Sequence, residues 1–328
     1  MQRRTLIQAA AGATATLALP TLRAQATQNL PTGAVRIIVG FPPGGGTDAL
    51  ARIVAAKLTP MWGLQVIVET KAGVAGVLAA DYTATQPADG TTLLMAHINS
   101  HALAPSLQPN LKYDPVTDFT PIALVGVTPN LLVCNPSQPA KTVPEIVALC
   151  KAKPGEISFG SAGSGSAQHL ALELFKLRAG INVIHVPYKG SAPAITDLIG
   201  GQIQYAFETM TAATPHVKGG RLIAIAQTRA RRAKSYPNVP TMVELGYPGF
   251  EATTWYGLVG PAKLPAAMAQ RMNEDVNKVL AMPDVQASLE QYGAEDGGGT
   301  RERFAEFIKS EIAQWRKVVK EGNVKADN

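Results

Sequence analysis

The sequence predicts an α/β protein of two lobes, with mainly parallel sheets flanked by helices and two long strands that cross between the lobes. Short apolar runs rich in β-branched residues alternate with helical runs along most of the 328 residues. This pattern is typical of buried parallel strands joined by helices. Two long apolar strands, at 118–127 and 252–262, lack such a helix. The chain after them is helical only, at 265–282, 283–292 and 301–321.

The alternation assigns the remaining elements in chain order. Strands are predicted at 35–41, 64–70, 91–98, 131–135, 156–161, 182–188, 204–210 and 221–228. Helices are predicted at 48–58, 76–85, 143–151, 168–179 and 192–199. No repeat of fixed period is visible, so a repeat architecture is not predicted.

The two long strands are separated by a stretch of domain size, as expected of two crossings between lobes. We therefore expect 27–124 and 254–328 to form the first lobe, and 125–253 to form the second. Helix 301–321 is amphipathic and is predicted to pack its apolar side chains in the core of the first lobe. These side chains recur near spacings of three and four: Phe304, Phe307, Ile308, Ile312 and Trp315.

The N-terminal segment 1–26 is predicted to be an export signal peptide. Two arginines precede the almost uncharged, Ala-rich run 5–19, and a proline and small residues follow it, in the order that export signals have. The sequence leaves open whether export uses the general or the twin-arginine route, and where cleavage occurs.

Charge gives no sign of nucleic-acid binding. The formal net charge is +6, and the segment 1–26 carries three of the arginines and no acid, so the rest of the chain carries only a small positive charge. The one basic cluster, at 229–234, is expected to be a solvent-facing loop.

The two cysteines, Cys134 and Cys150, stand at apolar positions of a predicted strand and a predicted helix. An exported chain permits a disulfide between them. Two separate, core-facing thiols fit the same positions.

Two glycine-rich turns lead from a strand into a helix, one in each predicted lobe. The first is "FPPGGGTDALAR" at 41–52, and the second is "GSAGSGSAQHL" at 160–170. Such turns can present backbone N–H groups at a helix N-terminus, where the helix dipole favours an anion. We therefore predict that the two turns hold one anion between the lobes.

No motif of an enzyme or of a metal site accompanies these turns. The first lacks the lysine of a phosphate-binding loop, and the second matches neither the dinucleotide fingerprint nor the hydrolase nucleophile elbow. His97 and His101 are four residues apart but lack the glutamate of a metalloprotease helix. No catalytic residue, cofactor or metal is therefore predicted.

Seven segments occur in the order and spacing of one known family. They are "FPPGGGTDALAR", "ADGTTLL", "NLKYDPVTDFTPI", "FGSAGSGSAQHLALELFK", "VPYKGSAPAITDLIGGQI", "VPTMVELG" and "WYGLVGPA". The chain resembles the solute receptors of tripartite tricarboxylate transporters, often called Bug receptors, from about Val35 to Val319.

The resemblance implies a periplasmic binding protein of the Venus flytrap type, monomeric and without catalysis, that closes around a small carboxylate. Its implied partners are membrane permease subunits of a tripartite transporter or a signalling protein. One ligand carboxylate would be held by the two loop–helix N-termini. The implied binding residues are Phe41, Gly44, Gly45, Thr47, Asp48, His97, Asn99, Ser100, Ser161, Gly163, Ser164, Gly165, Ser166, Tyr188, Lys189, Gly190 and Glu208.

Two departures from the family pattern bear on the ligand. The usual Asn-Arg-Pro-Gly-Ala-Gly-Gly stretch is here "TKAGVAG" at 70–76, and Glu208 stands where Asp is usual. If Glu208 is ionised beside the ligand, it repels a second carboxylate and accepts from an amino or hydroxyl group. Dicarboxylates, tricarboxylates, amino acids and aromatic acids all remain open as ligands.

A rival interpretation is an exported α/β hydrolase that acts on small anions. It would use residues dispersed along the chain, namely His169, Glu208 and a serine of the second glycine-rich turn.

Overall fold

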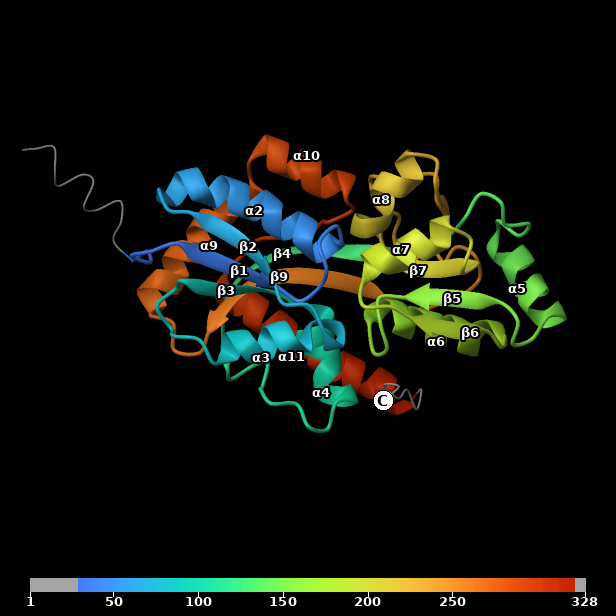
Figure 1. The fold of residues 1–328 in the computed structure, drawn as a ribbon, viewed down its shortest axis with the longest axis horizontal. Helices are drawn as coiled ribbons and strands as arrows, with labels where there is room; N and C mark the ends of the chain where they lie inside the picture. The colour runs from blue at the N-terminus through green and yellow to red at the C-terminus, as the bar shows by residue number, and fades with distance from the viewer. Residues whose placement is uncertain (1–28, 322–328) are drawn as a thin grey trace, which may run out of the picture.

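The computed structural model describes residues 29–321. Nine strands form one sheet in the order β2-β1-β3-β9-β4-β7-β5-β6, and β8 pairs with β4 (Figure 1). The strands are β1 (Val35–Val39), β2 (Val66–Thr70), β3 (Thr92–His97), β4 (Phe119–Cys134), β5 (Ser158–Ser161), β6 (Ile184–Pro187), β7 (Tyr205–Thr209), β8 (Ile223–Gln227) and β9 (Thr253–Pro261).

Helices cover both faces of this sheet. They are α2 (Gly46–Trp62), α3 (Val77–Ala84), α4 (Ala104–Leu107), α5 (Val143–Ala152), α6 (Ala167–Ala179), α7 (Ser191–Ile199), α8 (Met210–Lys218), α9 (Ala266–Leu280), α10 (Pro283–Gln291) and α11 (Arg301–Glu321). A 3₁₀ turn, η1 (Val74–Gly76), and a π-helical turn, η2 (Asn99–Leu103), complete the described elements. None of the helices among residues 29–321 is long and apolar enough to cross a membrane.

The sheet has two halves joined by β4 and β9. We call β1, β2 and β3 the first half-sheet, and β5 to β8 the second half-sheet. All pairings within the first half-sheet are parallel, and so are those among β5, β6 and β7. Parallel neighbours need a crossover connection, and helices α2, α3, α6 and α7 supply it. The antiparallel pairings all involve β4 or β9. The α/β class with flanking helices is thus confirmed, with a mixed sheet.

Strand β4 is the longest connection between the halves. It pairs with β9 as far as Pro129 and with β7 from Asn130 onward. The expectation of two separate strands, at 118–127 and 131–135, is therefore wrong. Proline and asparagine are poor strand formers. The strand nevertheless continues through Pro129 and Asn130, because it pairs with β9 before this point and with β7 after it. The lobe boundaries themselves stay a prediction.

The predicted strand at 204–210 was not expected to lead into a helix, but α8 follows β7 directly. Two threonines and Pro215 give this segment a weak helical signal. Its start is fixed by Thr209, whose side chain accepts a hydrogen bond from the Ala212 N–H at 3.3 Å.

Two hydrophobic cores lie on the opposite faces of the first half-sheet. Ile37 and Val39 of β1 pack with α2, α9 and α10, and Ile38 packs with α3 and α11, as the alternation of side chains along a strand requires. Figure 1 shows α2 and α10 on one side of the sheet and α3 and α11 on the other. The predicted core role of α11 is confirmed, since its buried side chains include Phe304, Ile308, Ile312 and Trp315.

The cysteines are free and buried, Cys134 on β4 and Cys150 on α5. Burial raises the pKa of each thiol to about 11. Both therefore act as small core residues rather than as reactive thiols.

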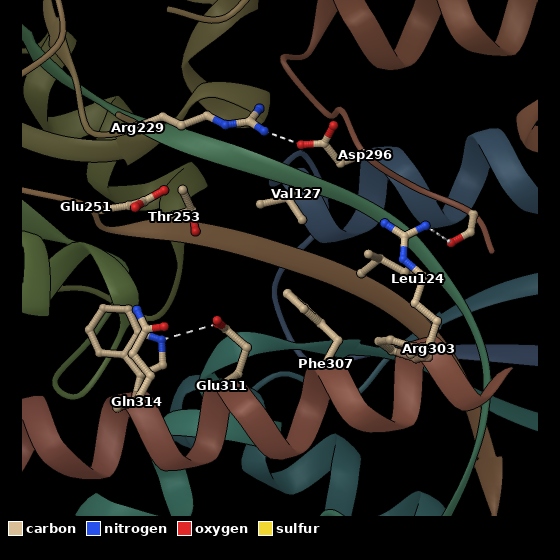
Figure 2. Close-up of a pocket in the computed structure, with 13 residues that line it drawn as sticks. Leu124, Val127, Arg229, Glu251, Thr253, Asp296, Arg303, Phe307, Glu311 and Gln314 are labelled. Atoms are coloured by element: carbon tan, nitrogen blue, oxygen red, sulfur yellow. Dashed lines mark hydrogen bonds and ion pairs between the residues drawn. The ribbon is translucent and has the colours of Figure 1, made fainter. Parts of the chain in front are cut away.

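The basic cluster at 229–234 is not simply a solvated loop. Arg229 is only 8% exposed and pairs with Glu295 at 3.1 Å and with Asp296. Figure 2 shows Arg229 reaching toward Asp296 beside a cavity of about 360 Å³ lined by β4, β9 and α11. Arg229 follows β8, whereas the two acids lie between α10 and α11, so this ion pair links the second half-sheet to the C-terminal helices.

Replacing Arg229 with alanine should lower the free energy of unfolding by about 1–2 kcal/mol, because it leaves the nearly buried Glu295 carboxylate with only the more exposed Arg231, at 3.4 Å, as an ion-pair partner. Urea denaturation of the full chain measures the change. Arg232→Ala is the matched control, since Arg232 pairs with Glu244 where both side chains are well exposed. Equal losses in the two variants would contradict a structural role for the Arg229 pair.

Candidate functional site

The first glycine-rich turn ends β1 and begins α2. Gly44 has φ +88°, a left-handed conformation that glycine adopts without strain. Gly45 is the N-cap and offers no side-chain acceptor. The first N–H groups of a helix lack intrahelical acceptors, so this end of α2 can donate to an anion. Asp48, in the first helical turn, is balanced by Arg52 at 2.9 Å and accepts from the Gly44 N–H at 3.2 Å.

Gly46 is the point of closest approach in this turn. A Cβ at this position would lie 2.5 Å from the Tyr256 hydroxyl of β9 and 2.9 Å from the Thr211 side chain of α8. Only glycine allows the start of α2 to approach the second half-sheet this closely.

In the second glycine-rich turn, several backbone N–H groups donate to side chains of the protein itself. The Gly163 N–H donates to the Ser161 hydroxyl, and the Gly165 N–H donates to Nδ1 of His169. The Ala167 N–H, at the start of α6, donates to Oδ1 of Asn99 at 3.0 Å. These three N–H groups are therefore already paired within the protein. A side chain that follows β3 caps the helix of the opposite half-sheet.

A small cavity lies between the two turns, and we call it the deep cavity. Its volume is about 10 Å³, which is room for about one water-sized group. Its lining comes from both half-sheets: Phe41, Gly45, Gly46, Thr47, His97, Ala162, Gln168, Ser191, Thr209 and Tyr256.

Several buried polar atoms around the deep cavity have no hydrogen-bond partner among the described residues. They are Oε1 of Gln168, the hydroxyl of Tyr256 and both carboxyl oxygens of Glu208. Leaving such groups unpaired costs about 1–3 kcal/mol each. Their concentration at one place makes this a strongly polar region, in which the Glu208 proton or a bound polar molecule can supply the missing partners.

His97 is an uncharged donor in this site. Burial, with a smaller contribution from His101, lowers the pKa of His97 to about 3. Its Nδ1 accepts from the Asn99 N–H at 3.2 Å, so the proton of the neutral ring is assigned to Nε2. The rings of Phe41 and Tyr256 pack edge-on against it, at 5.0 and 5.2 Å.

Glu208 of β7 is fully buried and lies beside Gln168 and Ser191, which line the deep cavity. Burial raises its pKa to about 8, and the nearby side chains of Ser191 and Gln168 only partly oppose this shift. The carboxyl group is therefore largely protonated at neutral pH. The repulsion expected of an ionised Glu208 does not apply there, and a protonated carboxyl can donate a hydrogen bond.

A second, larger cavity adjoins the first, and we call it the vestibule. Its volume is about 490 Å³, and it shares Phe41 and Ala162 with the deep cavity. Its lining is Gly40, Phe41, Ala72, Gly73, Val74, Ala75, Leu78, Ala162, Gly163, Ser164, Pro187, Tyr188 and Lys189.

The structure divides the residues predicted for binding into three groups. Phe41, Gly45, Thr47 and His97 line the deep cavity. Gly163, Ser164, Tyr188 and Lys189 line the vestibule, together with Phe41. The others do not line either cavity: Gly44, Asp48, Asn99, Ser100, Ser161, Gly165, Ser166, Gly190 and Glu208.

Sequence reasoning missed six residues of the deep cavity: Gly46, Ala162, Gln168, Ser191, Thr209 and Tyr256. Gln168 and Ser191 stand in the first turns of α6 and α7. Polar residues at the start of a helix that follows a strand and a loop are a signal from which both could have been predicted as binding residues. Tyr256 carried no local signal, because it lies inside a long apolar strand.

The side chains of the hydrolase alternative are not arranged for catalysis. The hydroxyl of Ser161 lies 2.7 Å from Nε2 of His185, so its histidine partner is not the His169 that the alternative requires. His169 stacks on His185, with ring centroids 4.0 Å apart. Residues 29–321 contain no group of three or more His, Cys, Asp or Glu that could hold a metal ion.

A family model, a related sequence and solved structures all match most of the length of this chain. The family model described as "Tripartite tricarboxylate transporter family receptor" matches residues 50–324. Protein BugT of Bordetella pertussis is 37% identical over 314 residues, covering 95% of this chain and 95% of that protein.

Two solved structures with bound acids are also similar. R. palustris Rpa4515 with adipate has a TM-score of 0.87 and 34% identity, covering 90% of this chain and 99% of that one. MatC from Rhodopseudomonas palustris with bound malate has a TM-score of 0.84 and 31% identity, covering 88% of this chain and 100% of that one.

Proposed function

Because this chain belongs to the tripartite tricarboxylate transporter receptor family, we propose that it is an extracytoplasmic solute receptor. It binds a small carboxylate between its two half-sheets and releases it unchanged. Two similar proteins were solved with adipate and with malate, which supports a carboxylic acid as the class of ligand.

The observation that carries this proposal is the polarity of the deep cavity. The N-terminus of α2 reaches it from one half-sheet, and Gln168 and Ser191 reach it from the other. His97 and Tyr256 add neutral donors, since burial keeps the ring of His97 uncharged and raises the pKa of Tyr256 to about 12. Such donors stabilise a carboxylate through hydrogen bonds and the helix dipole.

Ligand contacts that exist only when the halves meet would shift the receptor toward its closed form. In our proposal β4 and β9 act as the hinge. The receptor works as a monomer in the periplasm, without a cofactor. It delivers its ligand to the permease subunits of a tripartite transporter or to a signalling protein. The proposed signal peptide, 1–26, lies outside the described residues.

A thermal-shift screen of the purified protein tests the proposed class of ligand. The panel contains succinate, malate, adipate, citrate, glutamate and benzoate, with glucose and putrescine as a neutral and a cationic control. We expect one or more acids to raise Tm, because a ligand that binds only the folded state stabilises it. Shifts from the controls alone, or conversion of the acid during incubation, would contradict a carboxylate receptor.

A further inference from the structure

The two cavities differ greatly in size and share Phe41 and Ala162 in their linings. The deep cavity, at about 10 Å³, holds little more than one small group. An acid of more than a few heavy atoms must therefore extend past Phe41 or keep the half-sheets apart. The vestibule, at about 490 Å³, is the adjoining space with room for the rest of such a molecule.

Most side chains that line the vestibule are apolar, while backbone groups, Ser164 and Lys189 make about half of its surface polar. From the first half-sheet it receives Phe41, Val74 and Leu78, and from the second it receives Pro187 and the ring of Tyr188. The hydroxyl of Tyr188 is turned to Asp197, 2.8 Å away, so it is already satisfied. Lys189 is the one charged residue among those that line the vestibule. Among the side chains, a second carboxylate would find only Lys189 and Ser164 as polar partners beside the satisfied Tyr188, whereas an apolar group placed against Phe41, Val74 and Leu78 would be removed from water.

The rim formed by 73–76 has an unusual backbone. Val74 and Ala75 have φ of +47° and +51°, a left-handed conformation that β-branched residues rarely adopt. Val74 is 57% exposed and Leu78 is 49% exposed, so neither side chain is held there by burial in the core. Strain that is retained without a gain in packing points to a functional role.

We propose that the vestibule is a subsite for the apolar part of the ligand, and that this receptor prefers a monocarboxylic acid with an aromatic or branched aliphatic body. This inference rests on the proposed function, since the deep cavity must hold the carboxylate. The ring or branched chain then lies between Val74 and Leu78 on one side and Tyr188 on the other.

Calorimetric titration with propanoate and 3-phenylpropanoate tests the subsite, because the two acids share their carboxylate and differ by one ring. We expect the ring to raise the affinity of the native receptor at least about tenfold. Leu78→Ala and Val74→Gly should each reduce this gain at least about threefold, and the affinity for propanoate should not change. Val74→Gly also relieves the backbone strain, so it should fold.

Leu177→Ala is the matched control, since Leu177 is another exposed helical leucine and does not line the vestibule. It should leave the gain from the ring intact. The subsite is ruled out if the ring adds no affinity, or if the gain persists in both vestibule variants. Binding of succinate, malate or adipate without any gain from the ring overturns only the subsite. Failure of every acid to bind overturns the proposed function as well.

Discussion

Replacing Gly45 with valine is expected to lower the affinity for the bound carboxylate by about 100-fold or more, with little change in stability. Gly45 lines the deep cavity, and its φ of −84° is open to any residue. A Cβ there would meet only the Pro42 carbonyl oxygen, at 3.7 Å, so the first carbon fits. The two methyl groups beyond it would fill a cavity of about 10 Å³ and cover the N–H groups of α2.

Calorimetry with the acid that gives the largest thermal shift measures this loss. Gly33→Val is the matched control, because a Cβ at Gly33 has nothing within 4 Å and Gly33 lines neither cavity. The control should bind like the native receptor. Unchanged affinity in Gly45→Val, together with a normal Tm, would remove the deep cavity from the site.

The second large effect concerns Glu208 and pH. Its pKa of about 8 in the folded protein lies well above the ordinary value of 4.5, so the folded state binds this proton more tightly than the unfolded state. The stabilisation is complete below about pH 4.5 and is lost as the pH rises toward 8. Integrated over this window, the loss is on the order of 4 kcal/mol.

Glu208→Gln keeps the shape of the protonated carboxyl and removes its titration. We therefore expect the free energy of unfolding to fall less between pH 5 and pH 8 in this variant than in the native protein, as measured by urea denaturation at each pH. Glu302→Gln serves as the control, since Glu302 is exposed at the start of α11 and hydrogen bonds lower its pKa rather than raise it, so it should not contribute to a loss of stability over this window. Identical slopes for Glu208→Gln and the native protein would show that Glu208 titrates normally.

The fold was largely predictable because its strongest signals are local. Runs such as 35–41 and 64–70 are strands by periodicity alone, and the amphipathic pattern of 301–321 placed its apolar face in the core. The incorrect predictions concern segments whose secondary structure is determined by contacts between residues far apart in the sequence. Strand β4 continues through Pro129 and Asn130, where the Asn130 side chain donates to the Ala252 carbonyl oxygen at 2.7 Å, a contact with a residue 122 positions away.

The two glycine-rich turns were predictable, but their hydrogen-bond partners were not. The cap that Asn99 provides to the Ala167 N–H joins residues 68 positions apart. The unpaired hydroxyl of Tyr256 and the burial of Glu208 likewise depend on how the two half-sheets meet. Composition and local spacing indicate an anion site, whereas the three-dimensional contacts determine which donors are available to the anion.

A crystal structure of the full receptor with the acid that gives the largest thermal shift tests the central claim most directly. We predict a carboxylate group in the deep cavity, within hydrogen-bond distance of the N-terminus of α2 and of Gln168 or Ser191 from the opposite half-sheet. An acid bound elsewhere, such as the cavity between α11 and the Arg229 ion pair, with the deep cavity unchanged, would contradict the account.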